Sequence, residues 1–247
     1  MATEGNARQR KAPLRVIVAG AAGRMGSLVA KLAAADPRFS LAACLFHEKP
    51  GDARGAPAVT LEDLGPHLTH ADAAVDFSSP AGSLKLAALA AGSKTALVIG
   101  TTGFSKAQME KLRAFSRRIP VFYAPNFSPA VFLLCRLASE AAKALAGFDV
   151  SVSEVHHAGK KDAPSGTALA LAASIAKARR GRHVPIVSQR AGDIVGEHAA
   201  LLAGPHERLE IVHRAHARAL FAHGALDAAL WLRGRRPGFY GMEDMLG

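Results

Sequence analysis

The sequence LRVIVAGAAGRMG, from Leu14 to Gly26, joins a short run rich in β-branched residues to a turn that contains three glycines. The apolar run predicts a strand that is buried on both faces of a parallel sheet, and the following SLVAKLAAA predicts a helix. Between a strand and a helix, glycines permit a tight turn and let a pyrophosphate approach the helix N-terminus, where Arg24 is a further phosphate partner. The stretch therefore predicts a dinucleotide-binding fold; a tight turn without a ligand is the alternative.

The second predicted strand, Ser40 to Phe46, should end beside this turn. Dinucleotide-binding folds usually place an acidic residue there, which binds the adenosine ribose. This chain has Phe46 and His47 at the strand end, followed by Glu48 and Lys49. His47 and Lys49 could meet a 2′-phosphate, which favours NADPH. A slightly displaced Glu48 that still serves NADH is the alternative.

Strands and helices continue to alternate up to residue 127. Predicted strands cover 73–77, 95–99 and 121–123, and predicted helices cover 80–91, capped by Ser78 or Ser79, and 105–118. This alternation predicts an α/β fold of the Rossmann type, with a doubly wound parallel sheet. Because ligands bind beyond the carboxyl ends of such strands, the turn from Gly100 to Gly103 could line the nicotinamide side of the crevice.

After Pro129 the pattern changes. A predicted helix at 131–146 is followed mainly by strands, at 149–155, 186–189, 193–202 and 208–213, which predicts an α+β second domain. An alanine- and leucine-rich helix at 216–233 could return to pack on the first domain. We therefore predict a disordered basic tail at 1–12, a dinucleotide-binding domain at 13–127 and 216–247, and a substrate-binding domain at 128–215.

Polar chemistry is concentrated in EVHHAGKKDAPSGTA, residues 154–168. The alternation of the preceding strand places His156 and His157 at the strand end, pointing to opposite sides, with Lys160 within one turn. A helix that begins at Ser165 would direct free backbone NH groups at the space that these side chains surround. Together they predict a site for a small carboxylate. Taken singly, each histidine could be a satisfied polar residue and each lysine a solvated one.

The composition limits the class of protein. The chain has 247 residues, 49% of them hydrophobic, which suits one large domain or two small ones. Its net charge of +11 favours anionic partners, but Lys and Arg are scattered rather than grouped in a nucleic-acid-binding block. Cys44 and Cys135 lie in apolar runs, which indicates buried thiols in a reducing compartment. We expect a cytoplasmic protein without signal peptide, membrane span, metal or nucleic-acid partner.

Five motifs, in order along the chain, carry a family resemblance. They are GAAGRMG at Gly20, VIGTTGF at Val98, APNFS at Ala124, the 154–168 stretch, and RAGDIVGEH at Arg190. The 154–168 stretch agrees at every fixed position with the pattern E-x-H-H-x-x-K-x-D-A-P-S-G-T-A. The chain resembles the bacterial dihydrodipicolinate reductases, NAD(P)H-dependent enzymes of lysine and diaminopimelate synthesis, over nearly its whole length.

The resemblance implies roles for matching residues. His156 would be the catalytic acid/base, and Lys160 a second proton donor that also contacts the substrate. His157, Gly166 and Thr167 would hold the carboxylates of a cyclic imine substrate. The expected contacts to NADPH, or alternatively NADH, are Gly20, Ala21, Ala22, Gly23, Arg24, Met25, Phe46, His47, Gly100, Thr101, Thr102, Ala124, Pro125, Asn126 and Phe127. The family is typically homotetrameric through the sheets of its second domains, so residues 128–215 are also the expected tetramerisation domain.

Two departures from the family pattern affect these expectations. Phe46 and His47 stand where relatives often have an acid followed by arginine, and the connection between residues 180 and 186 is shorter than usual. We expect the second departure to change surface or assembly contacts and to leave the chemistry intact. Two other functions remain open: another two-domain NAD(P)-dependent reductase of an amino or keto acid, and a regulator that binds NAD(P) without turnover. The regulator could dispense with His156 or Lys160, and both are present.

Overall fold

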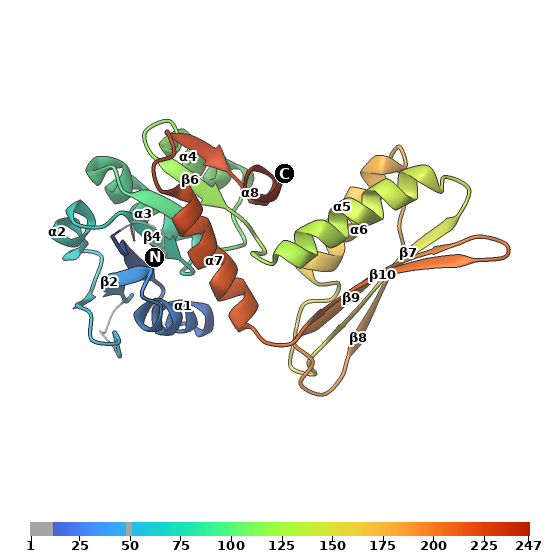
Figure 1. The fold of residues 1–247 in the computed structure, drawn as a ribbon, viewed down its shortest axis with the longest axis horizontal. Coiled ribbons are helices and arrows are strands. Elements are labelled where there is room, and N and C mark those ends of the chain that lie inside the picture. The colour runs from blue at the N-terminus through green and yellow to red at the C-terminus, as the bar shows by residue number, and fades with distance from the viewer. Residues whose placement is uncertain (1–11, 48–50) are drawn as a thin grey trace, which may run out of the picture.

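The computed structural model describes residues 12–47 and 51–247, so most of the predicted basic tail lies outside the described residues. Two sheets form the frame of the molecule (Figure 1). One sheet has seven strands and lies in the half that holds the N-terminus, and the other has four and lies in the opposite half. The predicted combination of a Rossmann-type sheet with a separate α+β unit is confirmed.

The seven-stranded sheet is parallel throughout and has the order β11-β6-β5-β4-β1-β2-β3. Its strands are β1 (Leu14–Ala19), β2 (Phe39–Leu45), β3 (Ala58–Val59), β4 (Ala73–Asp76), β5 (Ala96–Ile99), β6 (Pro120–Tyr123) and β11 (Gly238–Tyr240). The chain adds strands on one side of β1 up to β3 and then crosses to β4 on the other side. The strand order therefore reverses between β1 and β4, and ligands of such sheets are expected beyond the carboxyl ends of these two strands.

Helices cover both faces of this sheet. One face is covered by α1 (Arg24–Ala35) and α7 (Ala219–Leu232), and the other by α2 (Leu64–Thr69), α3 (Pro80–Ser93) and α4 (Lys106–Phe115). Val16 and Val18 pack under the first pair, while Ile17 packs under the second set, and all three are fully buried. Burial of each such side chain contributes about 1.5–3 kcal/mol, which explains why an uninterrupted apolar run forms β1.

The turn after β1 requires glycine at two positions. Gly20 has a φ of +76°, and a Cβ atom there would lie 2.5 Å from the carbonyl oxygen of Phe77. A Cβ atom on Gly26, in the first turn of α1, would lie 2.1 Å from the carbonyl oxygen of Gly20. The helix can approach the end of the strand only because both side chains are missing.

The four-stranded sheet has the order β10-β9-β7-β8. Its strands are β7 (Asp149–His156), β8 (Ile186–Arg190), β9 (Gly196–Ala203) and β10 (Arg208–Ala215). Only β7 and β8 are parallel; the other pairs are antiparallel. The helices α5 (Pro129–Ala144) and α6 (Gly166–Ala178) cover one face and form a third core with Val152, Ala200 and Leu202. On the other face Val187 and Val212 are 53% and 39% exposed.

Several predicted boundaries shift by a few residues. The helix α1 begins at Arg24, inside the glycine turn, and β9 begins at Gly196 rather than at Asp193, because a turn occupies residues 192 and 193. Ser79, rather than Ser78, caps α3 by accepting a hydrogen bond from the NH of Gly82. The elements β3, α2, β11 and α8 (Met242–Leu246) were not predicted, because each is too short to show a periodic pattern.

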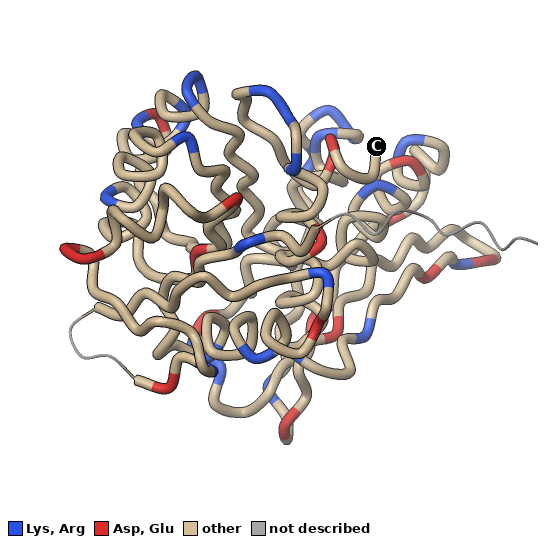
Figure 2. Tube along the Cα trace, turned by 60° about the vertical axis from the view of Figure 1, so that its left-hand side comes forward, with Lys and Arg blue, Asp and Glu red and all other residues tan. Residues whose placement is uncertain are grey.

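Lys and Arg residues are spread along the chain in both halves of the molecule (Figure 2). The connection between α6 and β8 is a short loop that turns through Arg180 and Gly181, whose φ values are +57° and +85°. Across the described part of the chain, each helix is too short or too polar to cross a membrane.

Candidate active site

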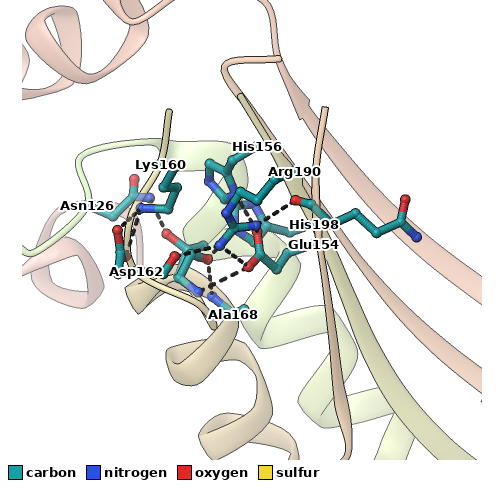
Figure 3. A network of polar contacts seen from close by, with 11 residues as sticks. Asn126, Glu154, His156, Lys160, Asp162, Ala168, Arg190 and His198 are labelled. Carbon is teal, nitrogen blue, oxygen red and sulfur yellow. Dashed lines mark hydrogen bonds and ion pairs between the residues drawn. The ribbon is translucent and has the colours of Figure 1, made fainter. Parts of the chain in front are cut away.

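A buried polar network lies at the carboxyl end of β7, where His156 is the last residue of the strand (Figure 3). Nδ1 of His156 is hydrogen-bonded to Oε2 of Glu154, which lies two residues earlier and therefore on the same face of the sheet. Arg190, the register partner of His156 on β8, donates to both oxygens of Glu154 at 3.0 and 2.9 Å. This bidentate pair fixes the carboxylate, which in turn fixes the imidazole.

Charges in this network are set by burial and by pairing. Burial alone would raise the pKa of Glu154, but hydrogen bonds from Arg190 and His156 outweigh it and hold the pKa at about 2. The pKa of His156 is lowered from 6.5, first by burial and further by the nearby charges of Lys160 and Arg190, while Glu154 acts in the opposite direction. The ligand-free protein therefore holds His156 mainly neutral at pH 7.

The other ring nitrogen of His156, Nε2, faces Gly196 at the start of β9. A Cβ atom on Gly196 would lie only 2.9 Å from Nε2. Glycine at this position leaves the nitrogen accessible, and Nε2 is the atom through which His156 can exchange a proton with a ligand, since Nδ1 is occupied by Glu154.

The predicted helix start at Ser165 is confirmed. Ser165 caps the helix, and its Oγ accepts a hydrogen bond from the NH of Ala168 at 3.2 Å. The NH of Ser165 itself donates to Oε1 of Glu154 at 3.2 Å. Gly166 and Thr167, the first two helical residues, have no acceptor four residues back, so their NH groups are available to an anion.

Cations flank the helix start, and each is already paired. Nζ of Lys160 lies 2.8 Å from both carboxylate oxygens of Asp162, and this contact is the main reason that the pKa of Asp162 is lowered. Nη2 of Arg218, the residue before α7, donates to Nε2 of His157 at 3.0 Å. Because a guanidinium group can only donate, Nε2 of His157 is the acceptor in this contact.

The predicted cofactor residues line the carboxyl edge of the seven-stranded sheet, with unequal exposure. The side chains of Ala22, Arg24, Thr102 and Pro125 are exposed, and Gly23 is exposed as well. Gly20, Met25, Gly100 and Asn126 are half-buried. Five others, namely Ala21, Phe46, Thr101, Ala124 and Phe127, are buried and could meet a ligand only through the backbone.

Phe46 and His47, which follow β2, differ in the exposure of their side chains. The side chain of Phe46 is 3% exposed and packs into the core, where its ring would contact a Cβ atom on Gly51 at 3.0 Å. His47 is exposed. Glu48 and Lys49, which we considered as ribose or phosphate partners, lie outside the described residues. Of the two described residues at this strand end, His47 is therefore the one whose side chain faces solvent.

The two halves of the molecule meet between Asn126 and Thr167. Nδ2 of Asn126, from the loop after β6, donates to Oγ1 of Thr167 in α6 at 3.1 Å, and Oδ1 of Asn126 accepts from the NH of Ser128. A predicted cofactor residue thus contacts a predicted substrate residue directly. This contact places the start of α6 beside the carboxyl edge of the first sheet.

Several residues with polar contacts at the site had received no role from sequence alone. Among them are Glu154, Asp76, Arg190, His198 and Arg218. Asp76, at the end of β4, is fully buried and accepts hydrogen bonds from the NH of Ser78 and the hydroxyls of Ser83 and Thr101. Burial raises its pKa. Arg190 and His198 lie within RAGDIVGEH, but only the pairing of β8 and β9 with β7 reveals which residues they contact.

Comparison with known proteins gives concordant matches. A family model for the N-terminus of dihydrodipicolinate reductase matches residues 14–127, and one for its C-terminus matches residues 130–246. The 4-hydroxy-tetrahydrodipicolinate reductase of Stenotrophomonas maltophilia (strain K279a) is 46% identical over 238 residues, which cover 95% of this chain and 98% of the relative. The protein of that name from Aquifex aeolicus (strain VF5) is 38% identical, with coverages of 95% and 99%.

A solved structure gives the same match at the level of the fold. The dipicolinate-bound dihydrodipicolinate reductase of Paenisporosarcina sp. TG-14 superimposes with a TM-score of 0.81 and 25% identity. The superposition covers 95% of this chain and all of the other.

Proposed function

The chain belongs to the dihydrodipicolinate reductase family, and from this membership we propose how its residues divide the work of the reaction. It is an oxidoreductase of lysine and diaminopimelate biosynthesis, a 4-hydroxy-tetrahydrodipicolinate reductase that uses NAD(P)H. Relatives of 46% and 38% identity over almost their whole length decide against a different two-domain reductase and against a regulator without turnover. Each residue assignment below is a proposal.

The cofactor is proposed to bind at the carboxyl edge of the seven-stranded sheet. The two crowded glycines, Gly20 and Gly26, let α1 start close to β1, and no side chain caps the start of α1 at Gly23. Free NH groups and the exposed Arg24 fit a pyrophosphate at this helix start. When bound, the nicotinamide cofactor supplies a hydride. The chain's own part is to orient it through the loops at 100–102 and 124–127.

The substrate is proposed to bind between His156 and the start of α6. A cyclic dicarboxylate needs two anion sites, and the relative from Paenisporosarcina binds dipicolinate. The NH groups of Gly166 and Thr167 would hold one carboxylate. Lys160 and His157 would hold the other. Lys160 is shared with Asp162, so a substrate carboxylate has to compete with Asp162 for the ammonium group.

His156 is proposed to donate the proton through Nε2. In the ligand-free protein its pKa is lowered by burial and by Lys160 and Arg190. Two substrate carboxylates bring negative charge beside the ring, which raises the pKa and loads a proton on Nε2 when the substrate is present. Negative charge that develops on the substrate as hydride arrives is then neutralised by this proton, and Lys160 adds electrostatic stabilisation.

We further propose that NADPH is preferred over NADH. Arg24, at the start of α1, and His47, just after β2, are exposed, and Phe46 supplies no carboxylate to bind the ribose hydroxyls or to repel a 2′-phosphate. Charge-assisted contacts to a phosphate contribute about 1.5–3 kcal/mol each, roughly ten- to a hundredfold in affinity.

The division into domains and the assembly are also proposals. Residues 13–127 and 216–247 contribute to the seven-stranded sheet and its helices, and residues 128–215 contribute to the four-stranded sheet, which supports a cofactor domain and a substrate domain. The open face of the four-stranded sheet exposes Val187 and Val212 and would join the sheets of a homotetramer. Light scattering coupled to size-exclusion chromatography tests the assembly.

A cytoplasmic location is supported by the two thiols. Cys44 is buried, Cys135 is half-buried, and neither forms a disulfide. Burial raises the pKa of Cys44 to about 11, with a smaller contribution from Asp52, so this thiol is poorly reactive.

The buried network of Glu154, His156 and Arg190 beside the start of α6 is the observation that carries the mechanism. The test is the oxidation of NADPH and of NADH with and without freshly generated substrate. Substrate-dependent oxidation is expected with both nucleotides, with the higher kcat/KM for NADPH. Substrate-independent oxidation, or none with either nucleotide, would contradict the proposal.

A further inference from the structure

His198 is a buried histidine with no role in the mechanism described so far. It lies on β9 with its ring facing the covered side of the four-stranded sheet, between Glu154 on β7 and His213 on β10 in the strand register. It is 4% exposed. Its ring meets that of His156 edge to face, with centroids 5.1 Å apart, and lies 6.4 Å from that of His213.

The one hydrogen bond of the His198 side chain among the described residues leads to the start of α6. Nε2 of His198 lies 3.1 Å from Oγ of Ser165, while Nδ1 is buried without a partner. The tautomer of His198 decides the direction of this bond: a proton on Nε2 is donated to Ser165 Oγ, whereas with the proton on Nδ1 the Ser165 hydroxyl donates to Nε2. In either case the bond ties the His198 ring to Ser165.

Ser165 connects this bond to the anion site. Its Oγ is hydrogen-bonded to His198 and accepts from the NH of Ala168, and its own NH donates to Glu154, so three contacts fix the residue before Gly166. Ser165 is 2% exposed, so water does not substitute for a lost contact without rearrangement. A shift of Ser165 would turn the NH groups of Gly166 and Thr167 away from a bound carboxylate.

We propose that His198 is a positioning residue that holds Ser165, and through it the start of α6, in the geometry that binds a substrate carboxylate. This inference rests on the proposed substrate site. His198 acts while neutral, because burial lowers its pKa to about 4, with a further contribution from His156 that outweighs the opposing effect of Glu154. His213 and Lys160, the other titratable groups that act on it, lower its pKa too.

A proton relay from solvent through His198 to His156 is the competing role. It would require His198 to take up a proton at working pH, against a pKa of about 4, and no hydrogen bond joins the two rings within the described residues. A relay would also act on kcat and its pH profile, whereas a positioning role acts on substrate affinity.

Two substitutions of matched chemistry test the proposal. Gln at position 198 carries an amide nitrogen about as far from the backbone as Nε2 and can reach Ser165, whereas Asn carries its amide at the level of Nδ1 and cannot. The probe is dipicolinate, whose binding is measured by calorimetry, followed by KM for the substrate and kcat. One lost neutral hydrogen bond corresponds to about a three- to tenfold loss of affinity.

We expect His198→Asn to weaken dipicolinate binding and raise KM for the substrate by about three- to tenfold, with kcat and KM for NADPH nearly unchanged. His198→Gln should stay within about twofold of the wild type. Ser165→Ala should show a loss at least as large as that of His198→Asn, and the double variant should add little to Ser165→Ala, since both remove the same bond. His213→Asn, which alters a neighbouring ring without contact to Ser165, is the control and should bind normally.

Equal binding by the Asn and Gln variants, additive effects in the double variant, or an equal loss in His213→Asn would each overturn the proposal. A change confined to kcat and its pH profile would favour the relay instead. Should His198→Asn not fold, Ser165→Ala and His198→Gln decide the matter, because the proposal requires weaker dipicolinate binding in the first and binding within about twofold of the wild type in the second. A wild type that neither binds dipicolinate nor reduces the substrate would instead refute the proposed function.

Discussion

The two halves of the proposed active site offer different kinds of groups to a ligand. At the cofactor edge the predicted contacts come from a glycine turn, a helix start and loops, and five of the predicted residues bury their side chains. At the substrate site the chemistry comes from ionisable side chains that are themselves buried, above all Glu154, His156 and His198. Backbone NH groups do not titrate, so they can donate a hydrogen bond at any working pH. Buried side chains depend on their partners for charge and orientation, so single substitutions should do more damage at the substrate site.

The two halves also differ in how they stabilise a buried carboxylate, as Asp76 and Glu154 show. Asp76 is the buried carboxylate of the cofactor half, and its partners are two hydroxyls and a backbone NH rather than a cation. Burial raises its pKa, whereas Arg190 keeps the pKa of Glu154 at about 2. The same side-chain type thus binds loop hydroxyls in one half and, in the other, helps to set the charge of His156, the proposed proton donor.

The largest effect is expected from His156→Gln. Glutamine cannot transfer a proton, so kcat should fall by about a hundredfold or more with little change in KM, since general acid catalysis contributes typically 10² to 10⁴. Steady-state kinetics of substrate-dependent NADPH oxidation measure this.

Two control variants compare the effect of His156→Gln with that of changes at a neighbouring position and at the cofactor edge. His157→Gln, at the next position, should raise KM rather than lower kcat. Thr102→Ala, at an exposed position of the cofactor edge, should change kcat/KM by no more than about tenfold, the value of one neutral hydrogen bond. If Thr102→Ala were as damaging as His156→Gln, the distinction between the two halves would fail.

The next effect concerns stability at low pH. His198 has a pKa of about 4 in the folded protein and about 6.5 when unfolded, so protonation favours the unfolded state. Its contribution to stability is complete above pH 6.5 and is lost as the pH falls toward 4, in total about 3 kcal/mol. The pKa values of His156 and His213 are also lowered, so the loss in the wild type exceeds this share.

Urea unfolding at several pH values measures the contribution of His198. The variant His198→Gln does not titrate, so its free energy of unfolding should fall by about 3 kcal/mol less than that of the wild type between pH 7 and pH 4. Glu154 has a pKa of about 2 in the folded protein, so its own effect on the free energy of unfolding changes only below about pH 4.5. It therefore does not account for a difference between the two proteins at higher pH. Parallel curves for both proteins would mean that His198 is not held neutral by burial.

Lys160→Ala should reduce kcat/KM by about ten- to a hundredfold, because a charge-assisted contact contributes about 1.5–3 kcal/mol. Both kcat and KM should change, since the ammonium group acts in binding and in the transition state. Asp162→Asn is the matched variant: it keeps Lys160 and removes the carboxylate that now occupies it. KM for the substrate should fall or stay constant in Asp162→Asn. An increase would show that Asp162 orients Lys160 rather than competing for it.

The sequence predicts local features of the two halves better than contacts between distant residues. The β-branched run of β1, the glycines after it and the capping serine of α6 act within a few residues, so their positions could be predicted from local pattern. Arg190 and His198 reach Glu154 and Ser165 across more than thirty residues. Such pairs depend on which strands are neighbours, and no local pattern contains that information.

Phe46 shows that a local pattern can also leave the direction of a side chain undetermined. The sequence predicts Phe46 as the last residue of the second strand, and it lies one residue beyond the end of β2. Strand periodicity does not reveal that its ring is buried next to residue 51. The side chain that faces solvent there is that of His47.

The last and smallest effect is on cofactor choice, and it tests whether any side chain of the cofactor edge matters. Phe46→Glu is a poor test, because a carboxylate in a core position that is 3% exposed would destabilise the fold by several kcal/mol. His47→Asp puts the acid at the exposed position, where it can accept hydrogen bonds from the ribose hydroxyls and repel a 2′-phosphate. The ratio of kcat/KM for NADPH to that for NADH should fall by about tenfold, the lower end of a charge-assisted contact. His47→Asn introduces a side chain of the same shape as aspartate but without its charge. It should shift the ratio by less than about threefold, which is half of the tenfold change on a logarithmic scale. If both variants leave the ratio unchanged, the adenosine end of the cofactor is held by backbone and by Arg24 alone, and the cofactor half depends even less on side chains than we infer.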